Sequence, residues 1–144
     1  MTVARIMKDK GHVVITASPH RTLKEVVDIL ATKRIGAIMV TGADNSIKGI
    51  ISERDIVRAM AKGGAAALDD AVSLHMTHKV ITCSSHDHIS HVMAEMTRGR
   101  FRHMPVVDGG VLTGIISIGD VVKIRIEETE AESRSLREYI QMGT

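Results

Sequence analysis

The feature that most constrains how this chain can fold is an internal repeat. The segment Gly49–Arg58 returns 65 residues later as Gly114–Lys123, and six of the ten positions are identical. Further matches lie upstream at an offset of 66 residues: Ile15-Thr16 with Ile81-Thr82, Val26 with Val92, Arg34 with Arg100, and Val40 with Val106. The one-residue difference falls at a turn, which is Gly42–Ser46 in the first copy and Asp108–Gly110 in the second. A chain duplicated over most of its length is expected to fold as two similar units.

Both copies predict the same order of elements, β-α-β-β-α, and hence an α+β fold. Apolar residues of the first copy recur at helical spacing and share one face: Leu23, Val26, Val27 and Leu30. Thr22 and Glu25 form a capping box in front of them. In the first copy we expect strands at Val13–Thr16, Ala37–Val40 and Ile47–Ile51, and helices from Leu23 and from Ser52. In the second copy we expect strands at Val80–Thr82, Met104–Val107 and Val111–Ile116, and helices over Ile89–Met96 and from Ser117.

The repeat also divides the chain of 144 residues. We expect one unit over 1–64, a second over 65–126, and a helical extension over 127–144, with Gly63–Ala67 as the linker. A unit of about 60 residues is only marginally stable alone, so the two should pack together. The last helix is expected to run from Asp120 towards Tyr139, and its charged stretch Arg125–Arg137 indicates either a solvated face or a dimer contact.

Composition excludes several classes of protein. No apolar run approaches the length of a membrane span, and the charged start of the chain is unlike a secretory signal. Cys83 is the only cysteine, so it forms no intramolecular disulfide, and we expect it buried in a cytoplasmic protein. The net charge of +2 is too small to indicate nucleic acid, and Phe101 and Tyr139 are the only aromatic residues. Binders of single strands need more aromatic platforms than this.

The doubled pattern resembles the CBS (cystathionine β-synthase) domain family, in which a tandem pair is called a Bateman module. The matching words in the first copy are Arg5-Ile6-Met7, Val14-Ile15-Thr16, Arg34–Val40 and Gly49–Asp55; in the second they are Met76-Thr77, Val80-Ile81-Thr82, Arg102–Asp108 and Gly114–Asp120. The resemblance implies two repeats packed with pseudo-two-fold symmetry and two clefts between them. In relatives these clefts hold AMP, ATP, S-adenosylmethionine or a nicotinamide dinucleotide, so we expect a bound AMP, ATP or NAD(H) here, a homodimer and a regulated protein as partner.

The candidate site residues begin with Ser-x-x-Asp, present as Ser52 with Asp55 and as Ser117 with Asp120. A helix starting after a buried strand directs its N–H groups and positive dipole end outward, which favours a phosphate. The serine hydroxyl donates to an oxygen, and the aspartate carboxylate suits the two ribose hydroxyls. The same spacing also describes a helix capping box. These readings are compatible, because a ligand can displace a cap.

Basic residues separate the two copies. Arg54 lies inside the first motif, where the second copy has Gly119, whereas Arg102-His103 of the second copy correspond to Gly36-Ala37. The resemblance places these side chains near phosphates. It also places the following residues at the ligand: Thr16, Gly36, Ala37, Lys79, Val80, Thr82, Met104 and Pro105. We therefore expect two clefts that differ in affinity or in ligand.

Other functions are less well supported by the sequence. The cluster His86–His91 lies at a helix start, where its side chains diverge, so no metal site is expected. No Walker A loop, G-x-G-x-x-G, H-E-x-x-H or G-x-S-x-G motif occurs, so neither an enzyme nor a catalytic cofactor is expected. Arg98, Arg100 and Arg102 alternate and leave a nucleic-acid-binding protein as one alternative. A ligand-free structural or dimerisation module is the other.

Overall fold

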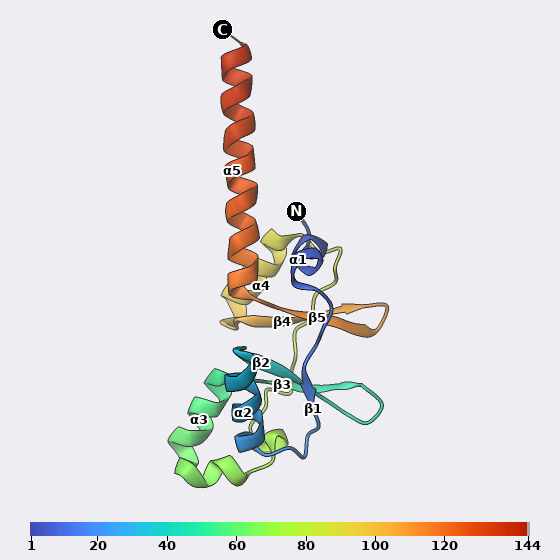
Figure 1. Ribbon diagram of the computed structural model, residues 1–144, viewed down its shortest axis with the longest axis vertical. Helices are drawn as coiled ribbons and strands as arrows, with labels where there is room; N and C mark the ends of the chain where they lie inside the picture. Colours follow the sequence, from blue (N-terminus) through green and yellow to red (C-terminus); the bar gives the residue numbers. More distant parts are fainter. Residues whose placement is uncertain (144) are drawn as a thin grey trace. The chain divides into compact units, whose positions relative to one another are not determined.

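The computed structural model describes residues 1–143, which form two compact units, each containing one copy of the repeat (Figure 1). One unit is Val13–Ile81. The other joins Met1–His12 to the part of the chain that begins at Thr82. The packing unit of the first copy thus extends to Ile81, beyond the expected boundary at residue 64, and the first twelve residues pack with the second copy.

The unit of the first copy is a three-stranded sheet covered by helices. Its elements are β1 (Thr16–Ala17), α2 (Leu23–Lys33), β2 (Ala37–Thr41), β3 (Ile47–Ser52), α3 (Glu53–Gly63), and the short 3-10 helices η1 (Gly64–Asp69) and η2 (Val72–Leu74). The strands lie in the order β1-β2-β3; β1 is parallel to β2, and β3 is antiparallel to it. The predicted capping box opens α2, with the Glu25 N–H donating to Thr22 Oγ1 over 3.2 Å. Leu23 and Val26, predicted on the helix's apolar face, are fully buried.

The unit of the second copy repeats this plan with fewer strands. Its elements are α1 (Val3–Lys10), α4 (Ile89–Gly99), β4 (His103–Asp108), β5 (Val111–Ser117) and α5 (Ile118–Met142). Strands β4 and β5 form an antiparallel hairpin, and Ile89, Val92 and Met96 of α4 are buried at the same spacing as Leu23, Val26 and Leu30 of α2. The mixed α+β composition is thus confirmed. Within residues 1–143, no helix is both long and apolar enough to cross a membrane.

Three local predictions differ from the structure. The strand expected over Val13–Thr16 is shorter and shifted, since β1 contains only Thr16 and Ala17. The expected strand Val80–Thr82 is absent, and only an isolated parallel bridge joins Cys83 to Val106. In such a strand Thr82 would face Pro105, which has no N–H with which to extend the pairing. The counterpart of Pro105 in the unit of the first copy is Met39, which pairs with Thr16 of β1. The expected linker Gly63–Ala67 instead ends α3 and enters η1, because Ala67 is buried in the hydrophobic core of its unit.

The start of each copy is covered by the segment that precedes the other copy in sequence. In one unit the Leu23 N–H donates to the Asp70 carbonyl, and Val72 is fully buried. In the other unit the Ile89 N–H donates to the Met1 carbonyl, and Val3 is fully buried. The two covering segments are Met1–His12 and the residues from Asp70 to Thr77. They play the same role, but each covers the copy other than the one that it precedes in the sequence. This exchange explains why Met1–His12 belongs to the unit of the second copy.

Cys83 is expected to be unreactive in the folded protein. It is buried, and burial, together with the nearby carboxylates of Asp87 and Asp108, raises the pKa of its thiol to about 12. Since the thiolate is the reactive form, labelling by Ellman's reagent at pH 8 should be more than about a hundredfold slower in native buffer than in guanidinium chloride. Equal labelling rates in the two conditions would contradict the buried position of Cys83.

Candidate functional site

The first Ser-x-x-Asp motif joins β3 to α3 and forms a complete capping box. The Ser52 N–H donates to Asp55 Oδ2 over 2.9 Å, and the Asp55 N–H donates to Ser52 Oγ over 3.4 Å. Asp55 is 8% exposed, the one buried charged side chain in the part of the chain that the structure describes. Its second oxygen, Oδ1, accepts a hydrogen bond from Thr77 Oγ1 at 3.1 Å and lies 3.7 Å from a guanidinium nitrogen of Arg58.

The second motif has the same geometry and a different partner. The Ser117 N–H donates to Asp120 Oδ2 over 2.8 Å, and the Asp120 N–H donates to Ser117 Oγ over 3.2 Å. The ammonium of Lys10 binds the same carboxylate at 2.7 Å. Both motifs are therefore helix caps in this structure, as the spacing alone predicts, and each aspartate also binds a side chain from the segment that precedes the other copy.

Tight packing positions these partners. In one unit Ile50 and Thr77 exchange two backbone hydrogen bonds, of 3.0 and 2.8 Å, and Met76 lies directly against Gly49. In the other unit the thioether end of Met7 lies directly against Gly114. Gly49 and Gly114 are equivalent in the repeat, so in both units a methionine of the covering segment lies against the same glycine position.

Sequence reasoning missed Lys10 and Thr77 as partners of the two aspartates. Thr77 appeared only within a family word, and Lys10 was not considered, because it lies 110 residues from Asp120. A signal existed: aligning Met7 with Met76 also aligns Lys10 with Lys79, which the resemblance did single out. Equivalence between the segments before the two copies would have drawn attention to Lys10.

Lys10 controls the ionisation of Asp120. Partial burial acts to raise the pKa of this carboxyl, but the Lys10 ammonium and the Ser117 N–H outweigh it and hold the pKa below its ordinary value of 3.8. A carboxyl whose pKa is lowered on folding stabilises the folded state above its unfolded pKa, and this contribution is lost as the pH falls through its folded pKa.

Replacing Lys10 with Met should raise the pKa of Asp120 in an NMR titration of its carboxyl carbon. It should also lower the free energy of unfolding at pH 7, and the difference between the two proteins should shrink as the pH falls through the folded pKa of Asp120 and the carboxyl becomes protonated. Lys8→Met is the matched control, since Lys8 is exposed on the same helix and is not a partner of Asp120. An unchanged Asp120 titration in Lys10→Met would show that the ion pair does not form in solution.

The structure assembles the remaining candidate residues in two groups. In one unit Ala37 pairs with Ser52, and the carbonyl of Gly36 accepts the Glu53 N–H over 3.0 Å. In the other unit His103 pairs with Ser117, and the carbonyl of Arg102 accepts the Ile118 N–H over 2.8 Å. These N–H groups, and those of both aspartates, are already hydrogen-bonded. The helix starts therefore have fewer free N–H groups for a phosphate than we expected from the sequence.

Several other candidates differ in accessibility. Thr16, Arg54, Lys79, Thr82 and Arg102 are exposed, whereas Val80 is half-buried. Met104 is 1% exposed and its side chain belongs to the hydrophobic core. Pro105 is buried as well. Any contact that Met104 makes with a ligand must therefore come from its backbone.

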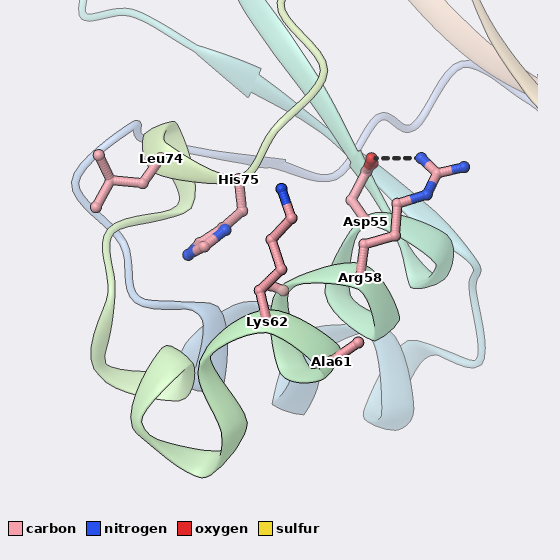
Figure 2. A pocket seen from close by; sticks show the side chains of 7 residues that line it. Asp55, Arg58, Ala61, Lys62, Leu74 and His75 are labelled. Atoms are coloured by element: carbon pink, nitrogen blue, oxygen red, sulfur yellow. Dashed lines mark ion pairs between the residues drawn. The ribbon is translucent and has the colours of Figure 1, made fainter.

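A cavity of about 380 Å³ opens beside Asp55 (Figure 2). Its wall consists of Asp55, Arg58, Ala59, Ala61, Lys62, Leu74 and His75. Figure 2 shows Lys62 of α3 extending between His75 and Arg58. The His75 ring nitrogen Nε2 is 2.8 Å from Asp70 Oδ2. The cavity thus places two cationic side chains, Arg58 and Lys62, close to the buried carboxylate.

The histidine cluster at the start of α4 has a structural use. Nδ1 of His88 accepts the Ser90 N–H over 3.1 Å and so caps the helix. Among residues 1–143, no three metal-binding side chains converge.

Comparison with known proteins assigns the repeats. The CBS domain family model matches residues 3–62 and 70–127, which include both Ser-x-x-Asp motifs. The chain belongs to the CBS domain family. It is 31% identical over 150 residues to the CBS domain-containing protein CBSX3, mitochondrial, from Arabidopsis thaliana, covering 99% of this chain and 73% of that protein.

Solved structures of CBS proteins resemble the present one closely. The CBS-domain containing protein ATU1752 from Agrobacterium tumefaciens is 45% identical, with a TM-score of 0.84 over 86% of this chain and 92% of that one. The CBS domain pair of protein MJ0100, in complex with 5-methylthioadenosine and S-adenosyl-L-methionine, is 25% identical, with a TM-score of 0.77 over 86% of this chain and 98% of that one. The resemblance inferred from the sequence motifs is thereby confirmed.

Proposed function

We propose that this CBS pair binds adenosine-containing ligands at its two Ser-x-x-Asp motifs and acts as a regulatory sensor without catalytic activity. The observation that carries the proposal is the pair of aspartates, each held in one orientation at a helix start. The complex of the MJ0100 pair with two adenosine compounds supports the choice of ligand class.

The carboxylates are suited to a ribose. An ionised carboxylate accepts hydrogen bonds only, and the 2′ and 3′ hydroxyls of a ribose are a matching pair of donors. The capping bonds fix one oxygen of each carboxylate: Oδ2 of Asp55 and of Asp120. A ribose bound to Asp55 would compete with Thr77 Oγ1 for Oδ1. These caps spare the aspartates the entropy cost of ordering when a ligand arrives.

We propose further that the two sites are unequal. Asp55 has the neutral partner Thr77, whereas Asp120 has the cation Lys10. Arg58 and Lys62 line the cavity beside Asp55 and could pair with an anionic part of the ligand. In the other unit Arg102 and His103 stand in place of Gly36 and Ala37. Because their charges differ, the two sites should differ in the order of their affinities for AMP, ATP and NAD(H).

The finer parts of the function belong to the same proposal. We propose AMP, ATP or NAD(H) as the ligand, a homodimer as the assembly, a regulated protein as the partner, and the cytoplasm as the location. Cys83 is poorly placed for nucleophilic catalysis, since it is buried and the pKa of its thiol is raised to about 12. One carboxylate oxygen of each aspartate is held in the capping box of its helix.

A thermal-shift panel tests the ligand class. A ligand that binds only the folded state raises the melting temperature by an amount that grows with its concentration. We expect a shift with at least one of AMP, ADP, ATP, NAD, NADH and S-adenosylmethionine, and none with GTP or CTP at the same concentration. A panel without any shift at millimolar ligand would favour a structural or dimerisation module instead.

A further inference from the structure

The C-terminal part of α5 has no packing partner within its own unit. The helix has 25 residues, and it buries Val121 and Ile124 in its first turns. From residue 132 to residue 143 every position is exposed. Figure 1 shows this part of α5 extending away from the rest of its unit. An isolated helix as short as this exposed part is only marginally stable in water, so a further contact would stabilise it.

An unpartnered stripe follows one side of this helix. Its members alternate at spacings of four and three residues along the whole helix: Val122, Ile126, Thr129, Ser133, Leu136 and Ile140. The four apolar members are 41% to 60% exposed. This spacing is the heptad pattern of a coiled coil, with Ile126, Ser133 and Ile140 at a and the others at d.

The stripe is not the face by which α5 packs in its own unit. That face carries Val121, Ile124 and the side chain of Glu128, which is 13% exposed. The centre of the stripe lies about 130° around the helix from that face, as the period of 3.6 residues requires. We propose that the stripe pairs with the same stripe of a second copy of this chain, in a parallel two-stranded coiled coil.

Charge selects the parallel orientation. In a parallel pair each g residue faces the e residue five positions later on the other helix. Glu132 at g then faces Arg137 at e, and Arg125 faces Glu130. In an antiparallel pair aligned over the full stripe, e faces e and g faces g, so Glu130 would face Glu130 and Glu132 would face Glu132. With the full stripe in register, only the parallel pair sets both Glu130 and Glu132 against arginines.

Glu132 and Arg137 are the better pair to test. Arg125 already forms an ion pair with Glu128 in its own helix. Among the residues that the structure describes, neither Glu132 nor Arg137 is engaged in an ion pair. Thr129 and Ser133 put two polar layers at the centre of the seam, which weakens a coiled coil while fixing its register. The dimer should therefore dissociate on dilution.

Cysteine cross-linking tests the seam and its direction on the full chain. In a parallel pair two copies of Leu136 share one layer, so Leu136→Cys should form a disulfide-linked dimer under mild oxidation. Glu138→Cys is the matched control, because position 138 lies on the outer side of the same turn. The buried Cys83 should not react. No cross-link at position 136, or an equal one at position 138, would overturn the proposal.

Charge reversal gives a second, independent readout by sedimentation. Glu132→Arg and Arg137→Glu should each weaken the dimer about 3- to 10-fold, and the double variant should recover to within about twofold of the original. A monomer at every concentration, or a double variant no better than either single one, would overturn the pairing. This interface would supply the proposed homodimer, but neither test involves a ligand, so the ligand proposal and the interface can fail separately.

Discussion

Replacing Asp55 or Asp120 with Ala should weaken one ligand site each and leave the other unchanged. A hydrogen bond to a charged group contributes about 1.5–3 kcal/mol, so losing the carboxylate should weaken the affected site about 10- to 100-fold. Asp120→Ala should also leave Lys10 without the carboxylate that it binds at 2.7 Å. Isothermal titration of each variant with the ligand that gives the largest thermal shift measures the affinity of the altered site and of the unaltered one.

Loss of a cap needs its own control, since both aspartates stabilise a helix start. Glu25→Ala provides it, because Thr22 and Glu25 form a capping box of the same geometry at the start of α2. Loss of the capping-box hydrogen bonds should by itself lower the free energy of unfolding by about 1 kcal/mol in each variant. Only the aspartate variants should lose ligand. Equal loss of ligand in Glu25→Ala would mean that helix stability, and not the carboxylate, controls binding.

Replacing Gly49 with Ala should strongly destabilise the unit of the first copy. A methyl group there would lie 2.8 Å from the Thr77 carbonyl oxygen and 2.7 Å from the sulfur of Met76. Backbone at that distance cannot move aside without breaking the two hydrogen bonds between Ile50 and Thr77. We expect a loss of about 1–3 kcal/mol in the free energy of unfolding, as for other overpacked interiors.

The equivalent Gly114→Ala is the matched comparison for denaturant unfolding. A methyl group at Gly114 would meet only the thioether end of Met7, which can adopt another rotamer. Gly114→Ala should therefore cost less than Gly49→Ala. Because Gly49 also holds Thr77 against Asp55, Gly49→Ala should weaken the Asp55 site as well. The opposite order of stabilities would mean that the covering segment at Thr77 is looser than the structure shows.

Much of the fold could be predicted from local pattern. The capping boxes at Thr22, Ser52 and Ser117 are all present, because a cap depends on residues only three apart. The matched pair Arg34 and Arg100 also has a structural meaning, since both end a helix in the left-handed conformation, with φ of 54° and 56°.

The exchange of covering segments could not be predicted in this way. Helical periodicity shows that α1 has an apolar face, but it does not show which hydrophobic core that face packs against. A side chain such as Val3 could be buried in the core of either unit. The Lys10–Asp120 pair depends on that exchange and so stayed hidden. The missing strand near Thr82 was predictable in principle, since Pro105 lacks the N–H that pairing needs.

The most direct test of the account is the number and strength of ligand sites on the unmodified chain. Isothermal titration with S-adenosylmethionine and, separately, with AMP should show two sites of different affinity for at least one of them. Two identical sites would contradict the inequality inferred from the partners Thr77 and Lys10. An absence of binding by every adenosine compound would contradict the proposed function itself.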